Sequence, residues 1–453
     1  MPSGRSEPWR ARDRKVLWHP FTQQELWMDE EFPVIVAGRG NHLVDADGRK
    51  YLDGVSSLWC NIHGHARREI NAAMKRQLDR IAHATFLGLT NPPAIELGEK
   101  LVEIAPPGLT RVFYSDNGST AVEVALKMAF QYWQQNGQRA RTKFVTLDAA
   151  YHGDTVGAVS VGGIELFHGL FKPLLFRSIK APATYAYRCE RSRTLEECGQ
   201  HTIADIEAIL KTHAHEVAAL VVEPLIQGAG GMITQPRGFV TGLRHLCDKY
   251  GVLMIADEVM TGFGRTGRMF ACEHEGVTPD LMAVSKGITG GYLPLAATLA
   301  TEKLYKGFLG DLKEGRTFFH GHTYTGNPLA CAAALASLEL FRKGKLLEEV
   351  RRRIHRLGNL LQDLYLIPQV GDIRTAGLIA GIELVADPEK RTPYPPEART
   401  GHRVILEARK RGAILHPLGD TIVLMPPLSI TEKELEKLVG ITVESVKAVL
   451  STS

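Results

Sequence analysis

Lys286, in the segment VSKGITGG, is the residue whose neighbours most favour covalent chemistry. It follows a short apolar run, residues 281–285, and precedes a glycine-rich turn. A lysine that is partly removed from water at a strand end can be neutral enough to form an imine with an aldehyde. The glycines would let a flat ring approach the backbone. Because most lysines are simply solvated, other groups must support this interpretation.

The adjacent carboxylates Asp257 and Glu258 are a second chemical signal, because they end the apolar run 252–256. Burying a carboxylate costs several kcal/mol unless a cation or hydrogen-bond donors pair with it. A metal, a cationic side chain or the nitrogen of a cofactor ring could receive such a carboxylate. A solvent-facing carboxylate is the alternative interpretation.

The segment SDNGST contains Gly118 and Ser119 at the start of a stretch with helical periodicity. Thr120 and Glu123 have the spacing of a capping box. The free backbone N–H groups and the positive dipole end of such a helix start suit a phosphate. An ordinary helix cap has the same sequence pattern.

The segment YHGDT places Tyr151 and His152 after the apolar run 143–147. An aromatic ring there could stack on a planar cofactor, or it could close the end of the sheet. Together the four loops supply an amine, a carboxylate, a stacking ring and a phosphate-binding helix start. Pyridoxal 5'-phosphate requires these groups, so the sequence predicts a site for this cofactor.

A parallel sheet covered by helices would position the four loops. Apolar runs that alternate with amphipathic stretches predict an α/β fold, and ligands of open parallel sheets bind beyond the carboxyl ends of the strands. The expected strands are residues 112–115, 143–147, 218–223, 252–257 and 281–285. Residues 16–55 are expected to be extended segments with turns. A C-terminal helix should begin with a capping box at Thr431 and Glu434.

The length of 453 residues suits a large domain and a smaller one. We expect a large cofactor-binding domain over residues 76–335. A smaller α+β domain would combine residues 1–75 with residues 336–453.

Composition favours a cytoplasmic protein whose partners are small molecules. The net charge of +4 is small, and no run of Lys or Arg alternates with aromatics as in a nucleic-acid groove. No apolar run is long enough to cross a bilayer, and the basic start lacks the apolar stretch of a secretory signal. Six scattered cysteines form no CxxC pair, which argues against a disulfide framework and a zinc site.

Two other motifs are interpreted as structural. The sequence GFGRTG, residues 262–267, matches a dinucleotide fingerprint, but no helix is expected there and no acid ends a following strand. The pairs His63/His65 and His320/His322 have no carboxylate or cysteine at ligand spacing, so we predict no metal site.

Six segments, in family order and spanning nearly the whole chain, resemble the class III (omega) aminotransferases, which have the fold type I architecture of pyridoxal-phosphate enzymes. These segments are YSDNGSTAVEVALKMAFQYW, YHGDT, VVEPLIQGAGGM, IADEVMTGFGRTG, SKGITGGYLPL and HGHTYTGNPLACAAA. The resemblance implies that Lys286 forms the Schiff base, that Asp257 pairs with the ring nitrogen and that Tyr151 lies over cofactor and substrate.

The resemblance also implies the remaining cofactor contacts and a homodimer. Gly118 and Ser119 would hold the phosphate, and His152 would lie beside the cofactor. His322 and Thr323 in HGHTYTG would be further cofactor-binding residues, with Thr323 reaching the phosphate from the neighbouring subunit, so active sites would lie at the dimer interface.

Within this family, WHPFTQ, SSLWCNIHGHARREI and FACEHEGVTPDLMAVSKGITGG resemble the members that aminate 7-keto-8-aminopelargonate during biotin synthesis. Their amino donor is S-adenosylmethionine or lysine, and the segments leave both open. The implied substrate-binding residues are Phe21, Leu58, Trp59, Tyr151, Lys286, Gly321 and His416.

Three positions depart from the members that use S-adenosylmethionine. Leu58 stands where a Trp pair would begin, and Phe21 replaces a Tyr. His416 stands where an Arg normally grips the ketone carboxylate, and losing a charged hydrogen bond costs about 1.5–3 kcal/mol.

Two alternatives therefore stay open. A sibling omega-aminotransferase would act on a diamine or omega-amino acid with a 2-oxo acid. A cofactor-binding regulator without turnover is disfavoured, because both Lys286 and Asp257 are retained.

Overall fold

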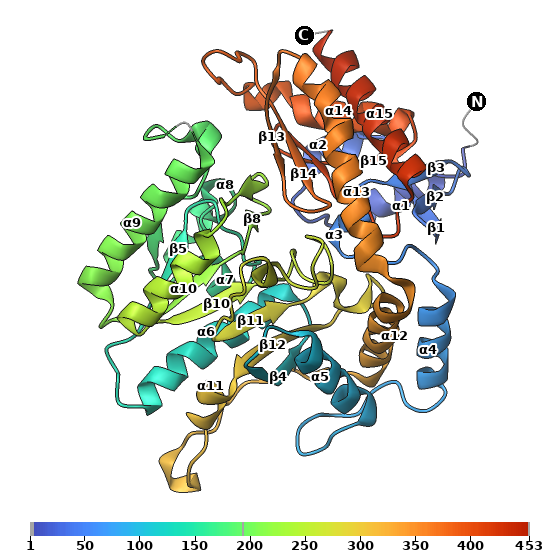
Figure 1. Ribbon diagram of the computed structural model, residues 1–453. Helices are drawn as coiled ribbons and strands as arrows, with labels where there is room; N and C mark the ends of the chain where they lie inside the picture. The colour runs from blue at the N-terminus through green and yellow to red at the C-terminus, as the bar shows by residue number, and fades with distance from the viewer. Residues whose placement is uncertain (1–3, 193, 452–453) are drawn as a thin grey trace.

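A seven-stranded, mostly parallel sheet forms the centre of the larger part of the molecule (Figure 1). The computed structural model describes residues 4–192 and 194–451. In sheet order the strands are β4 (Leu109–Ser115), β12 (Ala296–Thr301), β11 (Leu281–Val284), β10 (Leu253–Asp257), β7 (Val217–Val222), β5 (Lys143–Leu147) and β6 (Ile179–Ala181). β12 runs antiparallel to β11 and β4. The predicted α/β class and the five predicted strands are confirmed, whereas β6 and β12 were not predicted.

Helices cover both faces of this sheet, and the reason is visible in β7, where all side chains are buried. Ala219 and Val221 face one core cluster, while Leu220 and Val222 face another. Since successive strand residues point to opposite faces, a continuous apolar run requires two covering layers. The helices in these layers are α6 (Gly118–Gln135) on one face and α9 (Leu195–His213) and α10 (Phe239–Tyr250) on the other.

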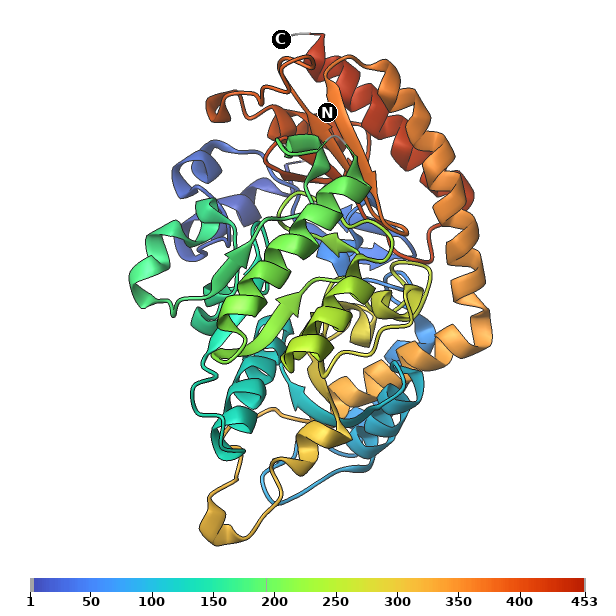
Figure 2. The same ribbon diagram turned by 60° about the vertical axis from the view of Figure 1, so that its left-hand side comes forward.

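Segments from both ends of the chain form the smaller part of the molecule. Both termini lie at this end of the molecule in Figures 1 and 2. One four-stranded sheet has the order β1 (Ile35–Arg39), β2 (His42–Asp45), β3 (Lys50–Asp53) and β15 (Ala413–Ile414). The other has the order β13 (Val370–Thr375), β14 (Ala380–Leu384), β17 (Thr421–Leu424) and β16 (His416–Leu418). The division at residues 75 and 335 stays a prediction.

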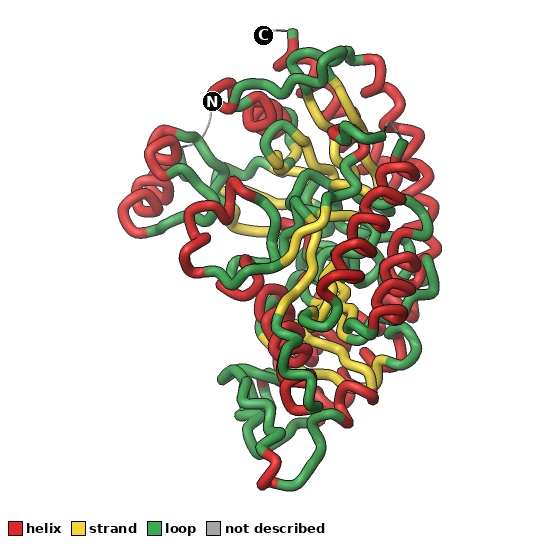
Figure 3. The backbone as a smooth tube through the Cα atoms, turned by 90° about the vertical axis from the view of Figure 1, so that its left-hand side faces the viewer, coloured by secondary structure: helices red, strands yellow, loops and turns green. Residues whose placement is uncertain are grey.

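Two successive helices that meet at a bend connect the two parts (Figure 2). They are α12 (Pro328–Gly344) and α13 (Leu346–Leu360), which meet at Lys345 with a left-handed φ of 50°. α4 (Arg68–Leu78) and α5 (Pro92–Ile104) pack against α12. In Figure 3 a mostly irregular region projects at the end opposite the termini, where α11 (Glu302–Lys306) and the segment after it lie.

The remaining elements are short or lie at the chain ends. They are the helices α1 (Glu7–Val16), α2 (Gln24–Asp29), α3 (Ser56–Trp59), α7 (Val156–Ser160), α8 (Glu165–His168), α14 (Thr400–Lys410) and α15 (Glu432–Leu450), the strands β8 (Ile226–Gln227) and β9 (Ile233–Thr234), and the 3₁₀ turns η1 (Gly169–Leu174), η2 (Ala186–Arg188), η3 (Ala271–His274), η4 (Lys286–Thr289), η5 (Leu312–Glu314), η6 (Leu361–Leu366) and η7 (Pro396–Ala398). The α2 helix corrects the expectation of purely extended structure over residues 16–55. Among the described residues, no helix combines the length and the apolar character needed to cross a membrane.

One of the two predicted capping boxes is wrong. α6 is capped by Asn117, whose side chain accepts from Thr120 N, while the Thr120 hydroxyl accepts from the Asn117 N–H. Glu123 instead accepts hydrogen bonds from the N–H groups of Gly157 and Ala158. A cap that begins three residues earlier leaves Glu123 free to cap the neighbouring turn.

The capping box of α15 is confirmed and predicts a stability effect. Thr431 Oγ1 accepts from Glu434 N, and Glu434 Oε2 accepts from Thr431 N at 2.9 Å. We expect Thr431→Ala to lower the free energy of unfolding by about 1 kcal/mol in chemical denaturation, since it leaves an N-terminal N–H of the helix unpaired. Thr212→Ala, on the exposed side of α9, should change it by less than about 0.5 kcal/mol. Equal effects would contradict the role of the cap.

Candidate active site

A cavity of ≈ 700 Å³ lies beyond the carboxyl ends of the parallel strands. Its wall includes the loops that follow β4, β5, β7, β10 and β11, as the open-sheet rule predicts. The predicted site residues that line it are Trp59, Gly118, Ser119, Tyr151, His152, Asp257 and Lys286. The four loops that the sequence analysis identified independently therefore meet at one cavity.

Lys286 begins the turn η4 directly after β11, with a left-handed φ of 34°. Its Nζ lies 5.1 Å from the centre of the Trp59 ring. Burial lowers the pKa of the Lys286 amine, while the charges of Asp257 and Glu223 oppose that shift. A larger fraction of the amine is therefore neutral and nucleophilic than for a solvated lysine.

Asp257, at the end of β10, is paired with a histidine rather than left alone. Its Oδ2 lies 2.7 Å from Nδ1 of the buried His152, and its Oδ1 accepts from Val259 N at 3.0 Å. Burial disfavours the charged imidazole, but the hydrogen bond and charge of Asp257 outweigh it, so the pKa of His152 is raised. These contacts orient the Asp257 carboxylate at the cavity wall.

Glu223 is a buried site residue that the sequence reasoning missed. It follows β7, and its carboxylate accepts from Tyr151 N at 3.0 Å and from Gly228 N at 2.9 Å. It therefore holds together two loops of the cavity wall. Burial raises its pKa to about 7. The signal was present, because Glu223 ends an apolar run just as Asp257 does.

The start of α6 is built to hold an anion. The N–H groups of Gly118 and Ser119 have no hydrogen-bond partner among the described residues. Ser119 Oγ lies 2.7 Å from Thr155 Oγ1, which fixes the loop opposite. A Cβ at Gly118 would come within 2.5 Å of Val259, and one at Gly153 within 2.4 Å of Ser119. Only glycines allow this close approach, and the helix dipole favours negative charge there.

Tyr151 extends the cavity wall. Its hydroxyl donates to Asp154 Oδ2 at 2.7 Å, and burial raises its pKa, so the hydroxyl stays protonated. Phe21 is 68% exposed and does not line the cavity, but its ring packs against Phe167 at 5.2 Å, and Phe167 lies 6.3 Å from the Tyr151 ring. The Phe21 segment therefore approaches the site from outside.

The other predicted site residues lie outside the cavity wall of this chain. Leu58 is exposed next to Trp59. His416 is half-buried on β16, where burial lowers its pKa. Gly321 and Thr323 lie in an exposed loop, while Nδ1 of the neighbouring His322 pairs with Oδ2 of Asp116 at 2.7 Å. Asp116 itself lines the cavity.

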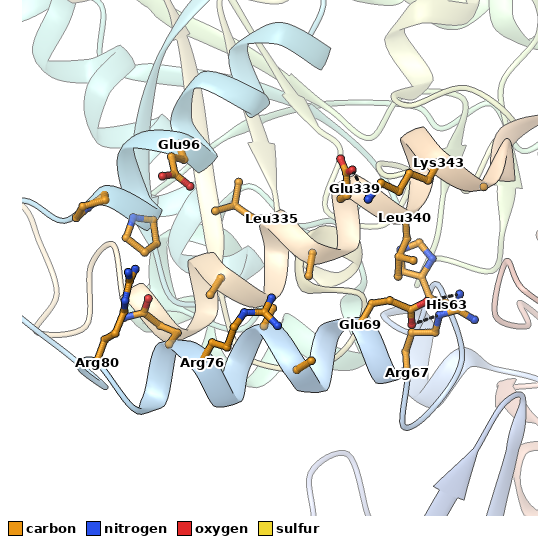
Figure 4. Close-up of a pocket in the computed structure, with 18 of the residues that line it drawn as sticks. His63, Arg67, Glu69, Arg76, Arg80, Glu96, Leu335, Glu339, Leu340 and Lys343 are labelled. Carbon is orange, nitrogen blue, oxygen red and sulfur yellow. Dashed lines mark hydrogen bonds and ion pairs between the residues drawn. The ribbon is translucent and has the colours of Figure 1, made fainter.

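A larger hollow of ≈ 1230 Å³ lies between α4, α5 and α12 (Figure 4). Two ion pairs lie along its rim, Arg67 with Glu69 and Glu339 with Lys343. Alanines of α4 and α12 form much of its remaining wall. It contains none of the predicted site residues, so the smaller cavity is the candidate active site.

Comparisons with known proteins show the family of the chain. The model of the family "Aminotransferase class-III" matches residues 26–446. The chain is 60% identical over 432 residues to adenosylmethionine-8-amino-7-oxononanoate aminotransferase of Nitratidesulfovibrio vulgaris, covering 95% of this chain and 80% of that protein.

Solved structures show the same fold. The crystal structure of the Methanocaldococcus jannaschii protein of that name has a TM-score of 0.93 and 45% identity, over 98% of this chain and 99% of that one. An amine transaminase from an uncultivated Pseudomonas species, solved in its PLP-bound form, has a TM-score of 0.91 and 37% identity, over 96% and 98%.

The raised pKa of Glu223 predicts a pH-dependent stability. Between about pH 4.5 and 7 the folded protein binds more protons at Glu223 than the unfolded chain does, so this stabilisation is lost as pH rises through 7. Relative to Glu223→Gln, the unsubstituted protein should lose on the order of 3 kcal/mol of unfolding free energy across this range, measured by denaturation without added ligand. Glu99→Gln, exposed on α5, should show no such trend. A flat difference for Glu223→Gln would refute the assignment.

Proposed function

Because the chain belongs to the class III aminotransferase family, we propose that it uses pyridoxal 5'-phosphate to aminate 7-keto-8-aminopelargonate in biotin synthesis. The protein is an aminotransferase of the predicted family. The observation that carries the proposal is the meeting of the Lys286 amine and the Asp257 carboxylate at one cavity. Proteins that share 45–60% of this sequence are named for the same reaction.

The residues present fit the proposed cofactor. Pyridoxal phosphate supplies an aldehyde that takes up amines and a protonated ring that withdraws electrons. Lys286 would anchor the aldehyde, and Asp257 would hold a proton at the ring nitrogen. The unpaired N–H groups of Gly118 and Ser119 would bind the phosphate, and Tyr151 would lie over the ring.

The protein's own groups then perform the proton transfers. The Nζ atom of Lys286 takes the proton from the donor carbon that bears the amino group, and it returns a proton during amination of the ketone. Its lowered pKa suits both tasks. His152 holds the Asp257 carboxylate in position through the contact of its Nδ1 with Oδ2.

We propose a cytoplasmic homodimer. The loop with Gly321 and Thr323 is exposed and separate from its own chain's cavity wall, and Phe319 beside it is 84% exposed. This position suits a loop that completes the site of a second copy. All six cysteines are free thiols, which suits a reducing compartment.

A sibling omega-aminotransferase is the second candidate. The observation that favours it is His416 at the position of the expected carboxylate-gripping Arg. Its acceptor would be a 2-oxo acid, and its donor a diamine or an omega-amino acid.

An amination assay tests the proposed function. Purified protein loaded with pyridoxal phosphate should convert the ketone to a diamine, by mass spectrometry, with either S-adenosylmethionine or lysine as donor. Lys286→Ala should lower this rate by at least 10³-fold, because it removes both anchor and base. Lys249→Ala, on the outer side of α10, should leave the rate unchanged. Turnover of pyruvate or 2-oxoglutarate without turnover of the ketone would support the sibling enzyme instead.

His416 offers a separate test of substrate binding. Its lowered pKa keeps the imidazole neutral near pH 7, so it cannot pair with a carboxylate as a cation. We expect His416→Arg to lower the KM for the ketone by roughly tenfold, which corresponds to one charged hydrogen bond of ~1.5 kcal/mol. In the unsubstituted protein the KM should fall as the pH is lowered toward the His416 pKa. An unchanged KM in His416→Arg would show that another group binds the carboxylate.

A further inference from the structure

The segment Ser56–Trp59 is one turn of left-handed helix. All four residues have positive φ, between 42° and 73°, and none is glycine. Backbone bonds close the turn, from Trp59 N to Val55 O and from Cys60 N to Ser56 O. Because left-handed backbone is unfavourable for L-residues, neighbouring groups must impose this conformation.

Asp53 is the group best placed to do so. Its side chain is fully buried at the end of β3. Oδ1 accepts from Ser57 N at 2.8 Å, and Oδ2 accepts from Ser57 Oγ at 2.8 Å. His65 Nε2 lies 2.9 Å from the same Oδ2 and fixes the carboxylate from the other side. Both bonds to Ser57 require an acceptor at each carboxylate oxygen.

Arg265 is a second side chain that binds the turn. It is fully buried, its Nη2 donates to Ser56 Oγ at 3.3 Å and its Nη1 donates to Pro426 O at 2.5 Å. The GFGRTG segment therefore has a structural role, because it positions the Arg265 guanidinium against the turn. Asp53 and Arg265 together bond the side chains of both serines.

The turn presents Trp59 to the cavity. The Trp59 side chain is 6% exposed, its ring lies beneath Lys286 Nζ, and its indole Nε1–H has no partner among the described residues. Behind the cavity, the ring packs against Val423 and Met425 of the smaller part.

We propose that Asp53 is a positioning residue for substrate binding. Its carboxylate holds the left-handed turn, and the turn places the Trp59 ring in the cavity wall beside Lys286, where the substrate would bind. The inference rests on the proposed function for its substrate, but the contact between Asp53 and the turn does not. Loss of the carboxylate should release Trp59 and weaken substrate binding without altering the chemistry at Lys286.

Asp53→Asn tests the proposal, because the amide cannot accept at both positions. We expect amide hydrogen exchange in the peptide 55–61 to quicken at least tenfold, measured by mass spectrometry with and without pyridoxal phosphate. The KM for the acceptor that the protein turns over should rise at least tenfold, while kcat changes less than threefold. Asp45→Asn, which alters another buried carboxylate on neighbouring β2, should change neither quantity.

A rescue variant separates positioning from general destabilisation. Glycine adopts positive φ without strain. Adding Ser57→Gly to Asp53→Asn should therefore restore slow exchange and reverse at least half of the increase in log KM. If Asp53→Asn does not fold, Ser57→Ala replaces it, with changes of at least threefold expected in the same directions.

Two outcomes would overturn the proposal. One is unchanged exchange in the peptide 55–61, and the other is faster exchange with an unchanged KM. If the unsubstituted protein does not aminate the ketone, the proposed function fails. The exchange data and the KM of the accepted substrate then still decide the role of Asp53.

Discussion

The burial of ionisable groups at one end of the sheet is the constraint on which the site depends. Asp257, Glu223 and His152 are buried in the cavity wall, where an isolated charge would be too costly to keep. The two carboxylates are satisfied by neighbours: Asp257 contacts His152, and Glu223 accepts from two backbone N–H groups. The parallel sheet makes this possible, because strand ends bring loops from distant sequence positions within bonding distance.

The sheet was predictable because its strands are buried on both faces and therefore appear as continuous apolar runs. β5 matches its predicted range, β10 and β11 differ by one residue at one end, and β7 is shifted by one residue at both ends. β6 and β12 were missed for different reasons. β6 has only three residues, and β12 is the alanine-rich run AATLAT, whose composition does not favour a strand.

The site was predictable only where chemistry and strand ends coincide, as at Lys286 and Asp257. The contact of His152 with Asp257 joins positions 105 residues apart and leaves no trace in local sequence. The left-handed turn at Ser56 was equally invisible, since four non-glycine residues predict no positive φ. Part of its cause is tertiary, because Arg265 contacts Ser56 across 209 positions.

The pairing of β3 with β15 has a consequence for the nascent chain. β3 ends at residue 53, but its partner begins at residue 413, and Met425 N also bonds to Gly54 O. During synthesis, the edge of β3 that pairs with β15 stays unpaired until nearly the whole sequence has left the ribosome. Such distant closure slows folding and exposes that edge to other chains, so the early hairpins are where assistance from a chaperone would matter most.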